Sequence, residues 1–181
     1  MSTASINRLL SRLIAALMSK NYIKVALLGL AIFVSVMAAA DGSIDGRVVA
    51  VADGDTLTVL DAENQQHKVR LAGIDAPEKA MPFGQVGKQK LSEMCFGKQA
   101  TVTVVNTDQY GRTVGDVNCE GLHANEEMVR GGYAWVYRHY DKGFEFFYPL
   151  EQAAKDAGLG LWADAEPTPP WQWRHSRKMK D

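Results

Sequence analysis

Apolar and polar side chains alternate along several short segments of the chain, a period-two pattern that is typical of β-strands with one buried face. Residues 46–52 and 56–60 show this pattern on either side of a polar Asp-Gly-Asp turn. In a third segment, 67–73, the alternation places Arg70 on the face opposite the apolar side chains. The pattern predicts a hairpin followed by a third strand from which Arg70 projects.

Two more strands and three helices are expected further along the chain. The strands span 100–107 and 113–119, on either side of a Tyr-Gly turn. The helices span about 88–95, 126–130 and 149–157, and glycines shortly after each of them supply helix ends. Five strands with helices between and after them predict an α+β, mainly β domain. Its expected form is a five-stranded OB-fold Greek-key barrel with about three α-helices.

Local signals refine the ends of these elements. The polar side chain of Asn125 is expected to cap the helix that follows it. The stretch 81–87, which contains one proline and two glycines, is expected to form a flexible loop. Beyond Glu166, three prolines argue against regular structure, and Trp171 and Trp173 are expected to pack this tail against the domain.

The beginning of the chain has the pattern of a signal peptide. Residues 25–40 form an uncharged apolar run that follows Lys20 and Lys24 and ends in three alanines, so cleavage is expected before Asp41. An uncleaved membrane anchor is the alternative, because this run falls just short of the roughly 17 to 25 residues that span a bilayer. Met18 offers a second possible start, which would leave a leader of ordinary length.

These patterns divide the chain into three parts. Residues 1–40 form the signal peptide or anchor, 41–165 the barrel domain, and 166–181 a tail that contains proline and tryptophan. At 181 residues with 46% hydrophobic positions, the chain can build one ordinary core. A secreted or periplasmic location is expected, or a membrane-anchored one facing outside the cytoplasm, and we expect a monomer.

The charge balance limits which nucleic-acid functions are plausible. The chain has 20 basic and 21 acidic residues, and four of the basic ones precede residue 40, so 16 basic and 21 acidic residues remain after it, a net charge of −5. Proteins that bind nucleic acid tightly and nonspecifically gain most of their affinity from Lys and Arg. This balance argues against tight, processive DNA binding, and any phosphate contact has to come from a local group of cations.

Export bears on the two cysteines, Cys95 and Cys119, because disulfides persist outside the cytosol. If the turn at 108–112 joins two antiparallel strands, Cys119 lies near Thr101. Cys95 is only a few residues earlier, at the end of an expected helix. A disulfide between the two is therefore plausible, and two buried free thiols are the alternative.

Three fragments of the chain, at 53–56, 70–78 and 108–112, carry acidic and basic side chains on or beside turns. Carboxylate oxygens are suitable ligands for a divalent cation such as calcium, and a further carboxylate can activate water. Arginine guanidinium groups match the geometry and charge of phosphate oxygens. Together these fragments supply what the hydrolysis of a phosphodiester requires.

In this combination the chain resembles the staphylococcal nuclease, or thermonuclease, family over about residues 46–164. Members have a D-G-D-T turn, an arginine and a D-x-P-E segment about one strand later, and a Y-G-R turn after the first helix. Each of these occurs here in the same order. The later pattern N-E-x-x-V-R-x-G is also present, at residues 125–132.

The resemblance implies a metal site and a catalytic carboxylate. Asp55 and Asp75 correspond to carboxylate ligands of a calcium ion, and Ala76 would add its main-chain carbonyl. Members commonly have threonine at this last position, and alanine keeps the carbonyl while losing a hydroxyl. Glu78 corresponds to the residue that orients or deprotonates the attacking water.

The resemblance also implies the substrate contacts. Arg70 and Arg112 would bind the scissile phosphate and stabilise the charge of the transition state. Tyr110 stands where members have a tyrosine near the nucleotide, and Tyr137 would supply a second ring. The implied activity is endonucleolytic cleavage of DNA and RNA that leaves 3′-phosphate products.

Each fragment alone is an ordinary turn sequence, and a non-catalytic OB-fold module that binds nucleic acid is the alternative function. Magnesium or manganese could replace calcium. The scattered histidines lack zinc-ligand spacing. Four cations near the C-terminus are expected to form a solvated basic tail: Arg174, Arg177, Lys178 and Lys180.

Overall fold

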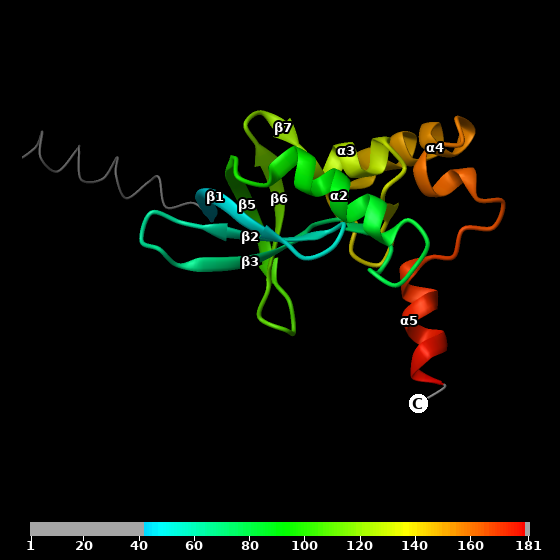
Figure 1. Cartoon of the computed structure of the whole chain (residues 1–181), viewed down its shortest axis with the longest axis horizontal. Coiled ribbons are helices and arrows are strands. Elements are labelled where there is room, and N and C mark those ends of the chain that lie inside the picture. Colours follow the sequence, from blue (N-terminus) through cyan, green and yellow to red (C-terminus); the bar gives the residue numbers. More distant parts are fainter. Residues whose placement is uncertain (1–41, 180–181) are drawn as a thin grey trace, which may run out of the picture. The chain divides into compact units, whose positions relative to one another are not determined.

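The computed structural model describes residues 42–179 (Figure 1). The expected signal peptide or membrane anchor at 1–40 and its cleavage point before Asp41 lie outside the described residues, as do Lys180 and the last residue. Among residues 42–179, no helix combines the length and the apolar character that crossing a bilayer requires.

Five strands form a closed barrel, which confirms the predicted fold class. Their order around the barrel is β3-β2-β1-β5-β6, and β6 also pairs with β3, so that the sheet closes on itself. All neighbours are antiparallel except β3 and β6, which run parallel. The strands are β1 (Ser43–Val51), β2 (Thr56–Leu60), β3 (Gln66–Leu71), β5 (Gln99–Thr107) and β6 (Thr113–Cys119).

Three two-residue strands and several helices complete the described part of the chain. The short strands are β4 (Ile74–Asp75), β7 (Leu122–His123) and β8 (Trp135–Val136), and β4 pairs with β8 outside the barrel sheet. The α-helices are α2 (Gly84–Cys95), α3 (Ala124–Arg130), α4 (Tyr148–Asp156) and α5 (Pro170–Lys178). Two 3₁₀ turns, η1 (Glu145–Phe147) and η2 (Gly160–Ala163), flank α4.

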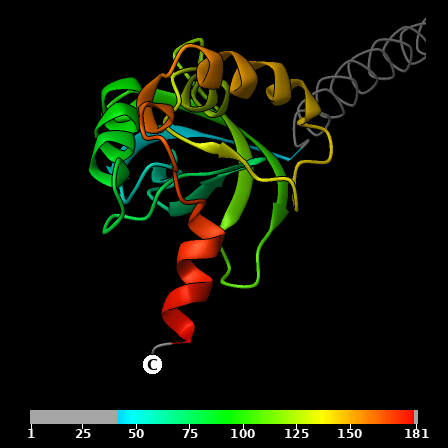
Figure 2. The same cartoon turned by 90° about the vertical axis from the view of Figure 1, so that its right-hand side faces the viewer.

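The core lies inside the barrel and beneath the helices that cover it. Alternate positions on the strands are fully buried, as the period-two pattern predicts; they are Val48, Leu57, Val59, Val69, Val102 and Val117. Figures 1 and 2 show α2, α3 and α4 grouped on one side of the barrel. The β5–β6 hairpin and α5 both project in another direction, away from those helices.

Two helices differ from the sequence prediction. Helix α2 begins at Gly84, so the last part of the expected flexible loop at 81–87 is helical. Helix α5 occupies part of the tail in which the prolines argued against regular structure. The reason is positional: Pro169 precedes the helix and Pro170 is in its first turn, where backbone N–H groups have no partner within the helix.

Asn125 does not cap a helix. Helix α3 begins two residues earlier than expected, at Ala124, and Asn125 is completely buried within it. Its amide nitrogen donates to the carbonyl oxygens of Ala72 and Gly115, and its amide oxygen accepts the N–H of Val117. Because an unpaired buried amide costs free energy, a residue that looked like a local cap is instead a link between α3 and the barrel strands.

The predicted disulfide between Cys95 and Cys119 is present, with the two Cα atoms 5.4 Å apart. Cys119 lies opposite Ala100, one residue from the expected partner, because a bulge between Val104 and Asn106 shifts the β5–β6 register. Both cysteines are essentially inaccessible to solvent. The bond joins the end of α2 to the end of β6.

Replacing both cysteines with alanine should lower the free energy of unfolding by about 2–4 kcal/mol, because the disulfide restricts the unfolded chain. Urea denaturation of the oxidised protein and of the Cys95→Ala/Cys119→Ala variant measures this difference. Reducing agent should shift the midpoint of the parent and leave the variant unchanged. Equal midpoints for parent and variant would contradict a stabilising bond.

Candidate active site

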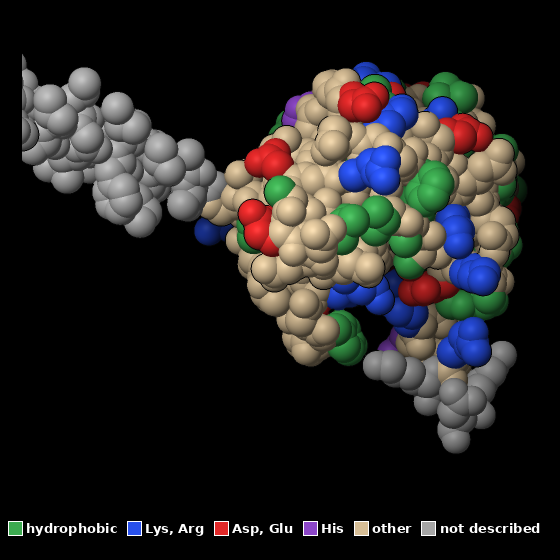
Figure 3. All heavy atoms as spheres, turned by 60° about the vertical axis from the view of Figure 1, so that its left-hand side comes forward, with side chains coloured by type: hydrophobic (Ala, Val, Ile, Leu, Met, Phe, Trp, Pro, Cys, Tyr) green, Lys and Arg blue, Asp and Glu red, His purple; other side chains and the backbone are tan. Residues whose placement is uncertain are grey.

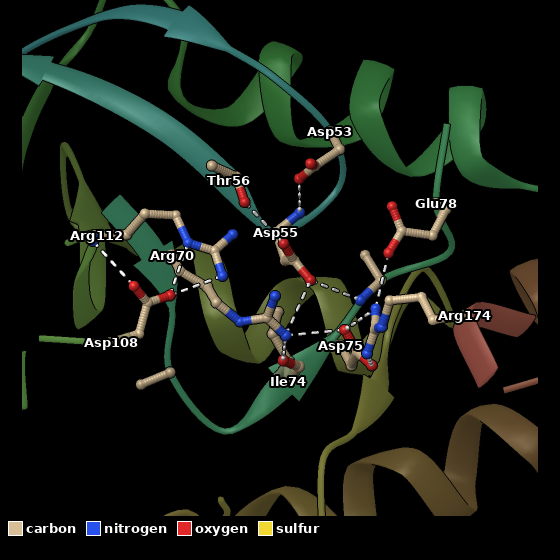
Figure 4. A network of polar contacts seen from close by, with 12 residues as sticks. Asp53, Asp55, Thr56, Arg70, Ile74, Asp75, Glu78, Asp108, Arg112 and Arg174 are labelled. Atoms are coloured by element: carbon tan, nitrogen blue, oxygen red, sulfur yellow. Dashed lines mark hydrogen bonds and ion pairs between the residues drawn. The ribbon is translucent and has the colours of Figure 1, made fainter. Parts of the chain in front are cut away.

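The predicted site residues come from turns at one end of the barrel. Asp55 lies between β1 and β2, Asp75 ends β4, and Glu78 follows in the segment that leads to α2. Arg70 projects from β3 as the alternation predicted. Figure 4 shows these side chains pointing toward one another.

Asp55 joins two of these turns through its buried carboxylate, which is only 4% exposed. Its Oδ2 accepts the backbone N–H of Ala76 at 2.9 Å, and its Oδ1 accepts the Thr56 hydroxyl at 2.9 Å. Burial raises the pKa of Asp55, while Arg70 and these hydrogen bonds act in the opposite direction. The carboxylate therefore fixes the position of the 74–78 segment relative to the β1–β2 turn.

Arg70 lies between the two buried aspartates. Its Nη2 is 2.8 Å from Oδ1 of Asp75 and 3.6 Å from Oδ2 of Asp55. Burial alone would lower the pKa of Arg70, but the two carboxylates raise it above its ordinary value. The guanidinium is charged. Because one of its nitrogens lies near both acids, the carboxylate oxygens of Asp55 and Asp75 lie close to each other.

Arg174, on the C-terminal helix α5, also reaches this region. Its Nη2 is 2.6 Å and its Nη1 3.2 Å from the two carboxylate oxygens of Asp75, and its Nη1 donates to Oε1 of Glu78 at 2.8 Å. The sequence interpretation had placed Arg174 in a solvated tail, which is wrong. A signal was present: Trp171 was expected to pack on the domain, and Arg174 follows it at helical spacing, on the same face.

Glu78 is held by the geometry of the chain around it. Its side chain is 39% exposed, and its carbonyl oxygen accepts the N–H of Met81 at 2.7 Å. Gly84 packs so closely against this carbonyl that a Cβ atom there would collide with it. Glu78 is thus a solvent-accessible acid on a tightly packed turn.

Arg112 is presented by the β5–β6 hairpin and oriented by Asp108. Both Nε and Nη2 of Arg112 lie 2.7 Å from Oδ2 of Asp108. Burial alone would raise the pKa of Asp108, but hydrogen bonds from Arg112 and from the Tyr110 N–H lower it. Tyr110, at the tip, is 74% exposed, and its ring centre is 5.6 Å from the Arg112 guanidinium.

A second layer of contacts supports Asp75 from β8. Asp75 pairs with Trp135, and the next residue of β8, Val136, donates its N–H to Oε1 of Glu151 at 2.9 Å. Glu151 is 2% exposed and also binds Arg138 and Lys155. Tyr137 follows directly and stacks on Trp171 with ring centres 5.5 Å apart.

One cavity of about 1130 Å³ brings most of these groups together. Its lining includes Arg70, Glu78, Tyr110, Arg112, Tyr137 and Arg174. Asp55 and Asp75 lie buried next to it, against Arg70. All the residues predicted from the sequence therefore lie in or beside a single site, except the two cysteines of the disulfide, and their individual roles stay predictions.

The residues that were expected to hold a divalent cation form a suitable environment for one. The carboxylates of Asp55 and Asp75 both lie near Arg70, and Asp75 also binds Arg174. The two acids therefore form a site of negative charge that attracts cations. Within residues 42–179, no group of three or more His, Cys, Asp or Glu side chains is arranged as a metal centre. The predicted set has only two carboxylates and completes itself with the carbonyl of Ala76, so the donor types fit calcium.

Comparison with known proteins agrees with this geometry. Residues 68–164 match the family described as "Staphylococcal nuclease homologue". The chain belongs to this family. An "Uncharacterized endonuclease" of Escherichia coli O157:H7 is 42% identical over 135 residues, which cover 74% of this chain and 87% of that protein.

Two other members of the family are about as similar to this chain in amino-acid identity. The "Micrococcal nuclease" of Shigella flexneri is 40% identical over 157 residues, covering 81% of this chain and 88% of that protein. The "Probable staphylococcal-like nuclease CAN1" of Oryza sativa subsp. japonica is 39% identical over 139 residues, 74% of this chain and 42% of that protein. The resemblance found in the sequence motifs is therefore confirmed.

Gly84→Ala should destabilise this member of the family by about 1–3 kcal/mol, although alanine is the better helix former, because its Cβ would displace the Glu78 carbonyl. Chemical denaturation measures the loss. Val86→Ala, at an exposed position of the same helix, serves as the control and should change stability by under about 0.5 kcal/mol. Equal stabilities for both variants would mean that this packing does not fix the Glu78 turn.

Proposed function

We propose that the protein is an exported, calcium-dependent endonuclease that hydrolyses phosphodiester bonds of DNA and RNA and leaves 3′-phosphate products. The observation that carries this proposal is the convergence of Arg70, Arg112 and Glu78 on one cavity, beside two buried aspartates. The coarser statement, that the chain is a phosphodiester hydrolase of the staphylococcal nuclease type, follows from its family and from relatives named as nucleases.

The two arginines suit a phosphate that lies between the barrel and the β5–β6 hairpin. Arg70 reaches the cavity from β3, and Arg112 reaches it from the hairpin. Each guanidinium presents a planar set of donors that matches two phosphate oxygens and retains its charge at any physiological pH. Both would hold the scissile phosphate and stabilise the additional negative charge of the pentacoordinate transition state.

Glu78 is the candidate base for the attacking water. It borders the same cavity as the arginines and is accessible to solvent, so a water molecule can lie against its carboxylate. The water oxygen forms a bond to phosphorus and its proton moves to Glu78, while the bond from phosphorus to the 5′ oxygen breaks and that oxygen leaves as a hydroxyl after taking a proton from solvent. A divalent cation held by Asp55, Asp75 and the Ala76 carbonyl would supply additional positive charge beside the phosphate.

The local charge supports nucleic-acid binding despite the acidic balance of the chain. On the face shown in Figure 3, Lys and Arg side chains, in blue, gather around a hollow at the lower edge. An acidic side chain, in red, lies next to them. Tyr110 and Tyr137 line the cavity and offer ring faces to bases of either sugar type. A non-catalytic binding module would have no need of a solvent-accessible acid such as Glu78 in the same cavity as the arginines.

The location outside the cytoplasm is supported by two features. The apolar run at 25–40 has the composition of a signal peptide. The Cys95–Cys119 disulfide suits an oxidising compartment. An uncleaved anchor would instead hold the same domain at the outer side of a membrane.

Glu78→Gln should lower the rate of cleavage of single-stranded DNA and RNA by a factor of about 10² to 10⁴, because the amide cannot accept the proton of water. Cleavage is followed on labelled oligonucleotides with calcium, magnesium, manganese or a chelator. Calcium should support the highest rate and the chelator should abolish it. The products should carry 3′-phosphate ends.

The matched control is Glu93→Gln, which removes an exposed acid from α2, outside the site, and should leave the rate unchanged. A Glu78→Gln variant as active as the parent would remove the proposed base. Cleavage that persists in chelator, or that only magnesium or manganese supports, would remove the dependence on calcium.

Expression of the whole gene in a bacterial host should yield a soluble protein outside the cytoplasm whose first residue is Asp41. Fractionation followed by N-terminal sequencing measures this. Recovery of the intact chain in the membrane fraction would support the anchor instead. Recovery in the cytoplasm with reduced cysteines would contradict export.

A further inference from the structure

The helix α5 places a cation of the protein itself on the carboxylates that are expected to bind metal and water. Arg174 makes two bonds to Asp75 and one to Glu78, at 2.6 to 3.2 Å. Asp75 is completely buried, and 36% of the Arg174 side chain is exposed. Ion pairs with a buried partner are screened less by solvent than surface pairs. This contact is therefore a substantial interaction and not a pairing of a loose tail.

The oxygens of Asp75 and Glu78 that accept hydrogen bonds from Arg174 cannot coordinate a metal ion and keep all of these bonds. Oδ1 of Asp75 accepts bonds from both Arg70 and Arg174, and Oδ2 accepts the shortest bond, from Arg174. Oε1 of Glu78 accepts a third bond from Arg174. A divalent cation that takes an oxygen of Asp75 into its coordination sphere has to replace at least part of this contact.

The net charge of the acids and arginines at the site also indicates competition between Arg174 and the cation. Asp55, Asp75 and Glu78 carry three negative charges, and Arg70 and Arg174 carry two positive ones. Adding a divalent cation to all five groups would give an excess of positive charge in a partly buried place. Without Arg174, the cation would bring the cluster close to neutrality, so Arg174 and the cation oppose each other's binding.

Helix α5 has few attachments that would prevent its release. Among the described side chains of α5, which do not include that of Lys178, Arg174 makes all the hydrogen bonds and ion pairs to the rest of the protein. The apolar attachments are at the start of the helix, where Pro170 is buried and Trp171 stacks on Tyr137 and meets Trp135 edge to face, with the ring centres of the two tryptophans 5.7 Å apart. Figures 1 and 2 show α5 projecting from the domain at the end of an extended segment.

We propose that Arg174 is a tethered competitor for the cation site and sets its affinity. Without a divalent cation, Arg174 occupies Asp75 and Glu78 and holds α5 on the site. A bound cation displaces it, so that Glu78 becomes free to bind water and α5 loses its polar anchor. This inference rests on the proposed function, because it takes Asp55 and Asp75 as the residues that bind the cation.

Competition fixes the direction in which the affinity for the cation changes when Arg174 is removed. This direction distinguishes competition from a role of Arg174 as a third phosphate-binding arginine. If Arg174 competes with the cation, its removal must strengthen cation binding, and cation binding must loosen α5 by the same coupling free energy. If Arg174 instead acts only as an additional phosphate ligand, its removal weakens substrate binding and leaves the affinity for the cation unchanged.

The test is calorimetric titration of calcium into the purified parent, Arg174→Gln and Arg177→Gln, in the absence of nucleic acid. Arg174→Gln should bind calcium about tenfold more tightly, equivalent to about 1.4 kcal/mol. Arg177→Gln removes the same charge from an exposed position of α5, one helical turn away, and should stay within about twofold of the parent.

Hydrogen exchange supplies the second measurement. In the parent, calcium should accelerate exchange of the amides of α5 severalfold, and in Arg174→Gln the same amides should exchange rapidly with or without calcium. The exchange of the barrel strands should be the same in both proteins, which shows that the variant is folded.

Equal or weaker calcium binding by Arg174→Gln would overturn the inference, as would an equal gain in Arg177→Gln. If the parent binds calcium and cleaves nucleic acid in a Glu78-dependent way while Arg174→Gln shows no gain, only the inference fails. If neither protein binds a divalent cation, the inference and the calcium dependence of the proposed function fail together.

Discussion

The buried carboxylate of Asp55 is the contact on which the site depends. It accepts the backbone N–H of Ala76 and thereby ties the turn between β1 and β2 to the segment that carries Asp75 and Glu78. The backbone carbonyl of Asp55 also accepts the N–H of Leu71, at the end of β3. An acid in this position is costly to bury unless hydrogen bonds and a counterion compensate it. Here Arg70 provides that counterion, so the same interaction that fixes the turns also builds a charged site.

Closure of the barrel brings the two catalytic arginine candidates together. The parallel pairing of β3 with β6 sets Arg70 opposite Val114, only two residues from Arg112. Without this pairing, the hairpin that carries Arg112 would be joined to the turns that carry the acids only from the other side of the sheet, through β1 and β2. The disulfide acts on the same strand at its far end, where Cys119 is bonded to Cys95 of α2. The barrel is thus a scaffold that holds functional residues from distant turns at one end.

The C-terminal helix changes how the site has to be understood. The barrel alone would present a cluster of three acids with one arginine, which favours a divalent cation. With α5 in place, Arg174 partly neutralises that cluster before any metal arrives. In our proposal, the affinity for the metal and the position of α5 depend on the same carboxylates.

The sequence by itself determined the barrel and the identity of the candidate site residues, because both are written in local patterns. Alternating side chains gave the five main strands to within a few residues, and the D-G-D-T, D-x-P-E and Y-G-R fragments named the acids and arginines. Only the tertiary structure decided what Asn125 and Arg174 contact. Asn125 is a residue type that often caps helices, but its partners are the nearby strand β6 and Ala72, which lies 53 residues earlier in the sequence. Arg174 lies 96 residues beyond Glu78, and no local pattern states where a short helix at the end of a chain packs.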